Sequence, residues 1–192
     1  MKDGVIIEAD KGTFTWHGAK SIFNVGIRII RNMMFGVLMY VLALIFATIR
    51  IASAQDYDAW LTGCEPYRAA VMQILDDEGI SRDYYYLMVA ESRCKPHAVS
   101  NKGARGFWQL MPATAKTYGC SNSFDLECAT RAAARYIRRL EAMFKRFDDV
   151  IAAYNMGGHN LKRHGKSRQA LGLIYTVHRI MQADERRHHD NQ

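Results

Sequence analysis

The chain has 192 residues, of which 49% are hydrophobic, and a formal net charge of +7. This length supports one hydrophobic core and excludes two full-sized ones, so a single domain is expected. Much of the positive charge lies beyond Lys162, which predicts an anionic partner such as nucleic acid, a lipid surface or a cell-wall polymer, or else a solvated helix face.

The first predicted element is an apolar segment, residues 33–49, which carries no charge and follows Arg28 and Arg31. The small residues Ala52-Ser53-Ala54 come next, which predicts export with cleavage before Gln55. An uncleaved anchor is the alternative, because the segment is close to the ~17 to 25 residues that cross a bilayer. The sequence thus divides into a polar N-terminal extension (1–32), a signal peptide or membrane anchor (33–54) and an exported domain (55–192).

All four cysteines lie in the exported part: Cys64, Cys94, Cys120 and Cys128. An even number of cysteines in an exported domain predicts two disulfides. Cys120 and Cys128 flank a short loop between expected helices, so we pair them, which leaves Cys64 with Cys94. Zinc is disfavoured because neither a Cys-x-x-Cys pair nor a matching histidine spacing is present, and no metal site is predicted.

The exported part shows helical periodicity with clear punctuation and no alternating strand pattern, which predicts an all-α fold. Pro66 is expected to begin a helix that Gly79 ends. Ser81 is suited to cap the next helix, residues 82–93. On that helix Glu91 shares a face with apolar residues.

The chain then loses its periodicity between Lys95 and Leu110. A short helix is expected from Pro112 to Gly119, and the longest helix over residues 125–147. A last helix begins at Ser167. The solvated side of the longest helix is predicted to carry Arg131, Arg135, Arg138 and Arg139.

A glutamate on the apolar face of a helix is costly to ionise, so its pKa should rise and it can hold a proton near neutral pH. This describes a general acid, which the cleavage of a glycosidic bond requires. The alternative is a structural glutamate that pairs with Arg93 or Arg105.

Three motifs then recur in order: Glu91-Ser92, the run from Gly106 to Pro112, and Ala153-Tyr154-Asn155-Met156-Gly157. Together they resemble the lytic transglycosylases, most closely the membrane-bound transglycosylase D branch. The resemblance implies a single lysozyme-like domain of the goose-type lysozyme and transglycosylase class. It also implies cleavage of peptidoglycan between N-acetylmuramic acid and N-acetylglucosamine, with 1,6-anhydromuramic acid ends and no cofactor.

By this resemblance Glu91 is the single catalytic acid. The residues expected to bind substrate around it are Ser100, Gln109, Met111, Tyr154 and Asn155. Trp108 either forms a wall of the cleft or belongs to the core. The sequence departs from the family pattern where many members carry a Glu-Thr pair before the last helix, because residues 169–180 read "QALGLIYTVHRI".

No second carboxylate falls in a matching motif, so the resemblance implies that the 6-hydroxyl of muramic acid supplies the second reactive group. The alternatives are a muramidase that uses water and an inactive peptidoglycan-binding scaffold. A nucleic-acid partner has no supporting motif. We expect the protein to act on glycan strands in the periplasm, or from an inner-membrane anchor through residues 33–49. Its small exported domain resembles enzymes that open gaps for secretion or conjugation machines.

Overall fold

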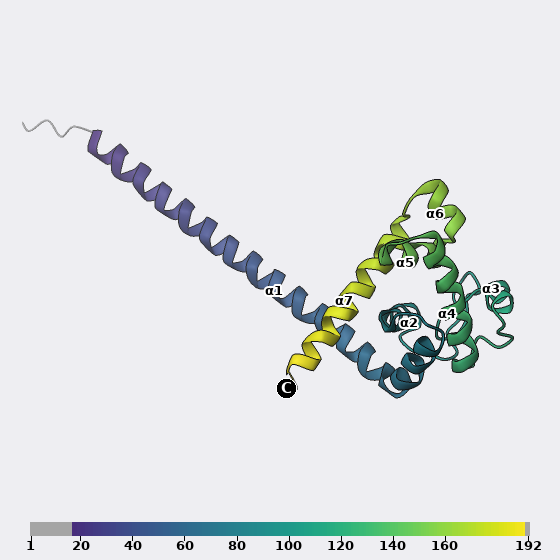
Figure 1. The fold of residues 1–192 in the computed structure, drawn as a ribbon. Helices are drawn as coiled ribbons and strands as arrows, with labels where there is room; N and C mark the ends of the chain where they lie inside the picture. The colour runs from purple at the N-terminus through teal and green to yellow at the C-terminus, as the bar shows by residue number, and fades with distance from the viewer. Residues whose placement is uncertain (1–16, 191–192) are drawn as a thin grey trace, which may run out of the picture. The chain divides into compact units, whose positions relative to one another are not determined.

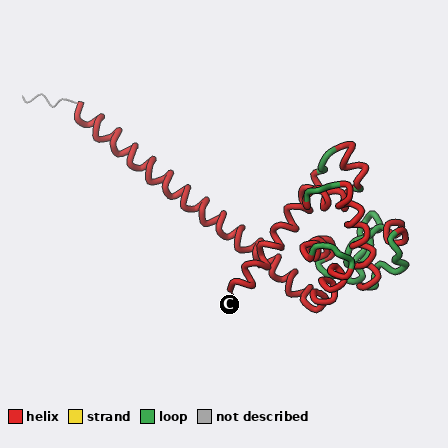
Figure 2. Tube along the Cα trace, in the orientation of Figure 1, coloured by secondary structure: helices red, strands yellow, loops and turns green. Residues whose placement is uncertain are grey.

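The structure, a computed structural model, describes residues 17–190, apart from the side chains of residues 17–27 and 47–56. It divides into two compact units, Met1–Arg50 and Ile51–Gln192. The elements are α1 (His17–Asp77), η1 (Arg82–Tyr84), α2 (Tyr85–Ser92), α3 (Pro112–Thr117), α4 (Leu126–Met143), α5 (Phe147–Met156), α6 (Gly158–His164) and α7 (Arg168–Asp190) (Figure 1). Between residues 17 and 190 there are helices and loops but no strand, which confirms the all-α prediction (Figure 2).

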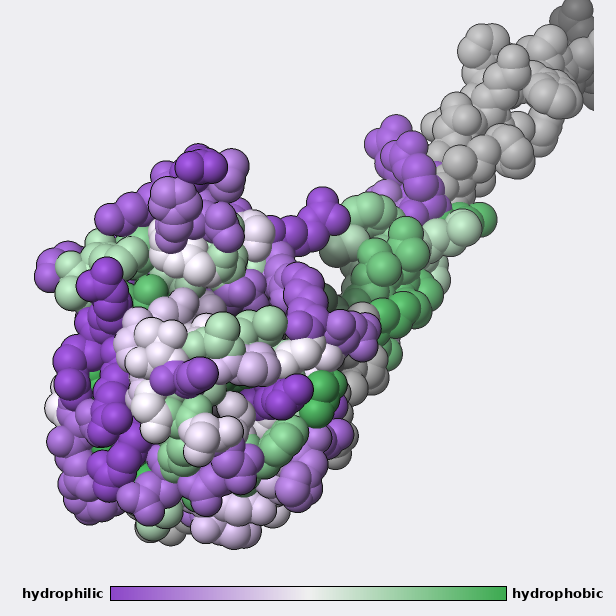
Figure 3. Space-filling view, turned by 90° about the vertical axis from the view of Figure 1, so that its right-hand side faces the viewer, coloured by the Kyte–Doolittle hydropathy of each residue, from purple (hydrophilic) through white to green (hydrophobic). Residues whose placement is uncertain are grey.

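The first unit contains a helical segment, Arg28–Phe46, that is long and apolar enough to cross a membrane. Its apolar side chains are exposed, and Figure 3 shows them as a band of hydrophobic surface. A signal sequence near an N-terminus has the same properties, so the segment indicates export or anchoring. Residues 1–16 of the predicted polar extension, and the side chains of the expected cleavage site Ala52-Ser53-Ala54, lie outside the described part.

Helix α1 ends as the sequence predicts but does not begin at Pro66, which lies inside it. At its end the amide of Gly79 donates to the carbonyl of Asp76 and the amide of Ile80 to that of Leu75, with Gly79 at φ +67°. These are the two bonds of a Schellman motif. The expectation for Pro66 was wrong because a proline removes only one backbone donor from a helix, and buried side chains before and after it, such as Leu61 and Leu75, pack on one core.

The longest predicted helix, residues 125–147, is shorter in the structure because α4 ends at Met143. Phe144 takes an extended conformation and α5 then begins at Phe147. Two acidic residues, Asp148 and Asp149, lie in the first turn of α5, where they favour a helix N-terminus. The sequence prediction placed the end of this helix about four residues too late, because the apolar residues Met143, Phe144 and Phe147 continue across the break.

The core of the second unit is formed around α7, which packs against both α2 and α5. Its largest fully buried side chains include Trp108, Tyr85, Leu87, Met88 and Ile137. Two disulfides join Cys64 to Cys94 and Cys120 to Cys128, the pairing expected from the sequence. The first fixes α1 to the end of α2, and the second spans the loop between α3 and α4.

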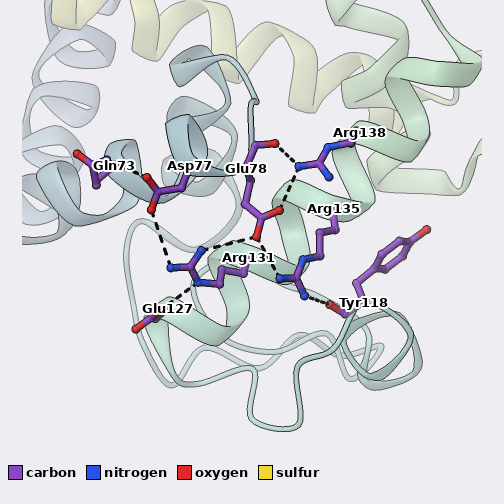
Figure 4. Close-up of polar contacts among 8 residues, drawn as sticks. All are labelled: Gln73, Asp77, Glu78, Tyr118, Glu127, Arg131, Arg135 and Arg138. Atoms are coloured by element: carbon purple, nitrogen blue, oxygen red, sulfur yellow. Dashed lines mark hydrogen bonds and ion pairs between the residues drawn. The ribbon is translucent and has the colours of Figure 1, made fainter.

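Arg135, Arg138 and Arg139 of α4 are exposed, as predicted, but Arg131, Arg135 and Arg138 also contact a carboxylate. Arg135 and Arg138 each place a guanidinium nitrogen 3.1 Å from the carboxylate of Glu78, at the end of α1, and Arg131 lies 3.7 Å away (Figure 4). Although burial opposes it, hydrogen bonds from Arg135 and Arg138 hold the pKa of Glu78 below its ordinary value. This cluster fastens α4 to the end of α1, so its charges have a structural role.

Candidate functional site

The helix that carries Glu91 is held in place at both ends. At its start the hydroxyl of Ser81 accepts a hydrogen bond from the amide of Asp83, which caps η1. At its end Arg93 and Cys94 both have positive φ values, 51° and 55°, so the helix stops immediately after the motif. The disulfide from Cys94 to Cys64 fixes this exit. Glu91 therefore lies at the end of a short helix whose other face is buried.

The carboxyl group of Glu91 is the perturbed acid of this region. Burial raises its pKa to about 7. Within the described residues no hydrogen bond or ion pair reaches this carboxyl group, so the structure does not support a pairing with Arg93 or Arg105. Near neutral pH the group is present in both its protonated and its ionised form, as acid and base catalysis requires.

Helix α5 brings Tyr154 to this carboxyl group. The hydroxyl of Tyr154 donates a hydrogen bond of 2.8 Å to the carbonyl of Trp108. Burial, and next the charge of Glu91, raise the pKa of Tyr154 well above its ordinary value, so the hydroxyl stays protonated. Behind it the ring of Tyr136 lies 5.3 Å from the ring of Tyr154, and its hydroxyl donates to the carbonyl of Ala153. The position of Tyr154 is thus fixed from two sides.

The irregular segment after α2 supplies the opposite side of the site. The hydroxyl of Ser100 accepts a hydrogen bond from the amide of Ala104, which closes a tight loop. The side-chain amide of Gln109 donates to the carbonyls of Ala98 and Gly106 at 3.2 and 2.9 Å. These bonds occupy the nitrogen of Gln109 and leave its oxygen as the acceptor that a ligand can use.

Gly106 has a conformational reason to be glycine at this point. Its φ is +71°, and a Cβ atom there would lie 1.8 Å from the carbonyl oxygen of Ser123. Any other residue would push the segment away from the loop before α4. Close backbone contact therefore determines the course of this wall of the site.

The six predicted site residues all line one cavity of about 510 Å³. They are Glu91, Ser100, Gln109, Met111, Tyr154 and Asn155. Trp108 does not reach the cavity, because it is fully buried and its indole nitrogen donates to the hydroxyl of Thr130 at 2.9 Å. Of the two interpretations of Trp108, the structure therefore supports the core.

Other residues of this cavity were missed by the sequence prediction. Besides the predicted six, its lining contains Asn101, Lys102, Ala104, Leu110, Thr114, Tyr136, Met156, Gly157 and Gln169. Gln169 comes from the first turn of α7, where the sequence departs from the family pattern, and that departure was the signal that could have found it. Tyr136 gave no signal, because a tyrosine on the buried stripe of a helix also fits the core.

Metal-binding groups do not explain this site. Among the described side chains, no three histidine, cysteine, aspartate or glutamate residues gather where they could hold a metal ion. The ionisable and hydrogen-bonding side chains of its lining include Glu91, Lys102 and Tyr154 together with Ser100, Gln109 and Asn155.

Comparison with known proteins places this arrangement in a family. The membrane-bound lytic murein transglycosylase D of Escherichia coli K12 is 30% identical over 128 residues, 62% of this chain and 26% of that protein. The transglycosylase F of Ectopseudomonas mendocina is 33% identical over 90 residues, 43% of this chain and 18% of that one. The chain thus spans about a quarter or less of the length of these two relatives.

A solved structure shares the fold. It is an inactive Glu-to-Gln mutant of the lytic transglycosylase Slt from Pseudomonas aeruginosa, with a TM-score of 0.54 and 18% identity over 59% of this chain and 23% of that one. The lysozyme-like fold expected from the sequence is therefore confirmed. The sequence profile of the transglycosylase SLT domain matches residues 76–175, which contain every residue that lines the cavity. With motifs, fold and profile in agreement, the chain belongs to the transglycosylase SLT domain family.

Proposed function

We propose that this protein is a peptidoglycan lytic transglycosylase. It cleaves the β-1,4 bond between N-acetylmuramic acid and N-acetylglucosamine and leaves a 1,6-anhydromuramic acid end. The observation that carries the proposal is that Glu91 is the single acidic residue among the described residues lining the cavity. Because burial raises its pKa to about 7, this one group can first give a proton and then take one.

In this reaction only Glu91 and the substrate form or break bonds. Protonated Glu91 gives its proton to the glycosidic oxygen, which leaves with the electron pair of its bond to C1. The resulting carboxylate then takes the proton of the muramic acid 6-hydroxyl while that oxygen bonds to C1. Glu91 ends protonated, and no water is consumed.

The remaining cavity residues hold the reactants. The hydroxyl of Tyr154, whose pKa is raised by burial and next by the charge of Glu91, sets the geometry and protonation of the acid together with Ser100. The oxygen of Gln109 and the amide of Asn155 orient polar groups of the glycan. Met111, which is 45% exposed, offers the sugar an apolar contact.

A muramidase that uses water is the second candidate. Retaining hydrolases need a second carboxylate ~5 to 5.5 Å from the acid, and inverting ones need it ~6.5 to 9.5 Å away. None of the described residues that line the cavity supplies one besides Glu91. The geometry therefore favours the 6-hydroxyl over water as the attacking group.

Mass spectrometry of digested cell-wall sacculi tests the proposal, with the full chain held in detergent. We expect muropeptides lighter by one water than the products of hydrolysis. Products with only reducing ends would establish a muramidase instead. No soluble product at any pH between 5 and 8 would indicate the inactive scaffold.

The proposed place of work is the periplasm. The apolar helix at Arg28–Phe46 and the two disulfides support it, because disulfides persist in oxidising compartments. Sequencing the N-terminus of protein from the cell envelope separates the two forms. A mature chain beginning at Gln55 indicates a cleaved signal, whereas an intact segment that withstands carbonate washing indicates an inner-membrane anchor facing the periplasm.

A further inference from the structure

A second cavity, of about 320 Å³, shares a wall with the first. The backbone amides of Arg105 and Leu110 each donate to the carbonyl of the other residue, at 2.9 and 3.2 Å. These two bonds close residues 105–110 into a small loop, which is called the ribbon below. Ala104 and Met111, just outside the ribbon, line the first cavity, whereas Arg105 and Pro112 line the second. A ligand that fills the first cavity therefore lies one ribbon away from the second.

The charged side chains that line this second cavity are all positive. Arg105 and Lys116 are the charged residues of its lining, and it contains no carboxylate. Among the side chains that the structure describes, none forms an ion pair with Arg105 or Lys116. Two such cations beside one concave surface attract an anion.

The rest of the lining suits a short peptide more than a bare ion. Pro112, Ala115 and Phe124 provide apolar surface, and Ser121 and Asn122 provide polar groups. The side-chain oxygen Oδ1 of Asn122 already accepts a hydrogen bond from the backbone amide of Phe124, which leaves the side-chain nitrogen of Asn122 as a donor. Apolar contacts, donors and two cations together fit small side chains and carboxylates.

This surface is also held rigid before a ligand arrives. Cys120, part of the lining, is bonded to Cys128, and its amide donates to the carbonyl of Ala115 at 2.8 Å. The backbone of Gly106 packs directly on Ser123, since a Cβ atom on Gly106 would lie 1.8 Å from the carbonyl oxygen of Ser123. A preformed surface loses little conformational entropy on binding, so two charged contacts can make a measurable contribution to the affinity for a ligand.

We propose that this second cavity binds the carboxylates of the peptide stem that the glycan strand carries, with Arg105 and Lys116 as its specificity-determining residues. The proposal rests on the proposed function for the identity of the strand. In the first cavity the enzyme holds the sugars, and across the ribbon it holds the stem attached to muramic acid. Strands with stems are then better substrates than strands without them.

Direct binding tests the second cavity independently of catalysis. The probe is the stem tetrapeptide released from sacculi by an amidase, compared with the same peptide after amidation of its carboxyl groups. The full chain in detergent should bind the free-acid peptide, and the Arg105→Gln/Lys116→Gln variant at least about fivefold more weakly. The control Arg139→Gln/Lys145→Gln removes the same charge from exposed positions away from this cavity and should bind as the parent does. Equal binding of the amidated peptide, or an equal loss in the control, overturns the proposal.

Kinetics then connect the cavity to the strand. On strands with stems the Arg105→Gln/Lys116→Gln variant should lose about tenfold in kcat/KM, whereas on strands stripped of stems it should stay within about twofold of the parent. Equal losses on both substrates would overturn the subsite. If the parent itself forms no anhydro ends on either substrate, the proposed function fails, while the peptide titration still decides whether the cavity binds carboxylates.

Discussion

The hydroxyl of Tyr154 donates a 2.8 Å hydrogen bond to the carbonyl oxygen of Trp108, across 46 residues of sequence. This bond joins α5 to the segment that carries Gln109, directly beside Glu91. It therefore couples the position of the acid's neighbour to the position of the loop that lines the cavity.

The Tyr154→Phe variant tests that coupling. Removing the hydroxyl deletes a buried hydrogen bond and leaves the carbonyl of Trp108 without this donor, so the free energy of unfolding should fall by about 1 to 3 kcal/mol. We expect kcat to fall by on the order of tenfold as well, because Glu91 loses a positioned neighbour. Urea unfolding and the release of anhydro muropeptides measure the two effects. Tyr175→Phe, at a 63% exposed position on α7, is the control and should change neither.

Replacing Glu91 with glutamine should separate activity from stability. The variant keeps the shape of the side chain but cannot transfer a proton, so turnover should fall by about 10² to 10⁴. As pH rises, the free energy of unfolding of the variant should increase relative to that of the parent. The folded pKa of Glu91, about 7, lies above its unfolded value near 4.5, so ionisation costs the parent stability progressively from about pH 4.5 to 7.

The shift in the pKa of Glu91 limits how much this stability difference can change with pH. Between about pH 4.5 and pH 7 the change is at most about 3 kcal/mol. Urea denaturation of both proteins at pH 4.5 and pH 8 measures it. Glu185→Gln, an exposed change on α7, should follow the parent at both pH values. A difference between Glu91→Gln and the parent that stays constant with pH would show that Glu91 ionises normally in the folded protein.

The residues singled out in the sequence meet at one cavity, but the sequence did not predict the other residues that line it. Glu91, Gln109 and Tyr154 meet at one cavity because each belongs to a motif whose order was visible in the chain. Gln169 and Lys102 also line it. The departure from the family pattern before the last helix marked the region of Gln169, whereas a single lysine in a loop carries no periodic signal, and only tertiary contacts bring Lys102 to the cavity.

Helix boundaries were likewise predicted correctly where local sequence determines them and incorrectly where tertiary packing does. Gly79 and Ser81 were predicted correctly because local backbone geometry and capping bonds determine their roles. Pro66 was misplaced because packing of the residues around it overrides a local preference. For Arg131, Arg135 and Arg138 the sequence predicted solvent alone, because their partner Glu78 lies more than fifty residues earlier.

The two disulfides should contribute unequally to stability. The Cys64–Cys94 bond spans 30 residues and the Cys120–Cys128 bond spans 8, so closing the longer loop restricts the unfolded chain more. Loop entropy gives about 3.6 kcal/mol for the first and about 2.5 kcal/mol for the second. We expect Cys64→Ser/Cys94→Ser to lower the free energy of unfolding more than Cys120→Ser/Cys128→Ser. The opposite order in chemical denaturation would mean that native contacts, rather than loop closure, dominate.

The last prediction concerns Asp184, a 2% exposed carboxylate on α7 that fastens three helices together. It accepts two hydrogen bonds from Arg68 of α1, at 2.9 and 2.5 Å, and one of 2.7 Å from the hydroxyl of Tyr86 on α2. Although burial opposes it, these partners hold the pKa of Asp184 below its ordinary value. Breaking the buried pair leaves Arg68 with only the exposed carboxylate of Glu65, 3.9 Å away, so Asp184→Asn should lose about 3 to 5 kcal/mol at pH 7.

The pH dependence of that loss identifies its cause. A depressed folded pKa gives stability that is present above the unfolded value of about 3.9 and disappears as pH falls through the folded value. The gap between the parent and Asp184→Asn should therefore narrow below about pH 4, with Glu185→Gln, next to it on α7, remaining near the parent throughout. Because Tyr86 and Glu91 share α2, we also expect Asp184→Asn to lower kcat while it remains folded at low temperature. A variant with the parent's kcat would show that the clamp stabilises the fold without orienting the catalytic helix.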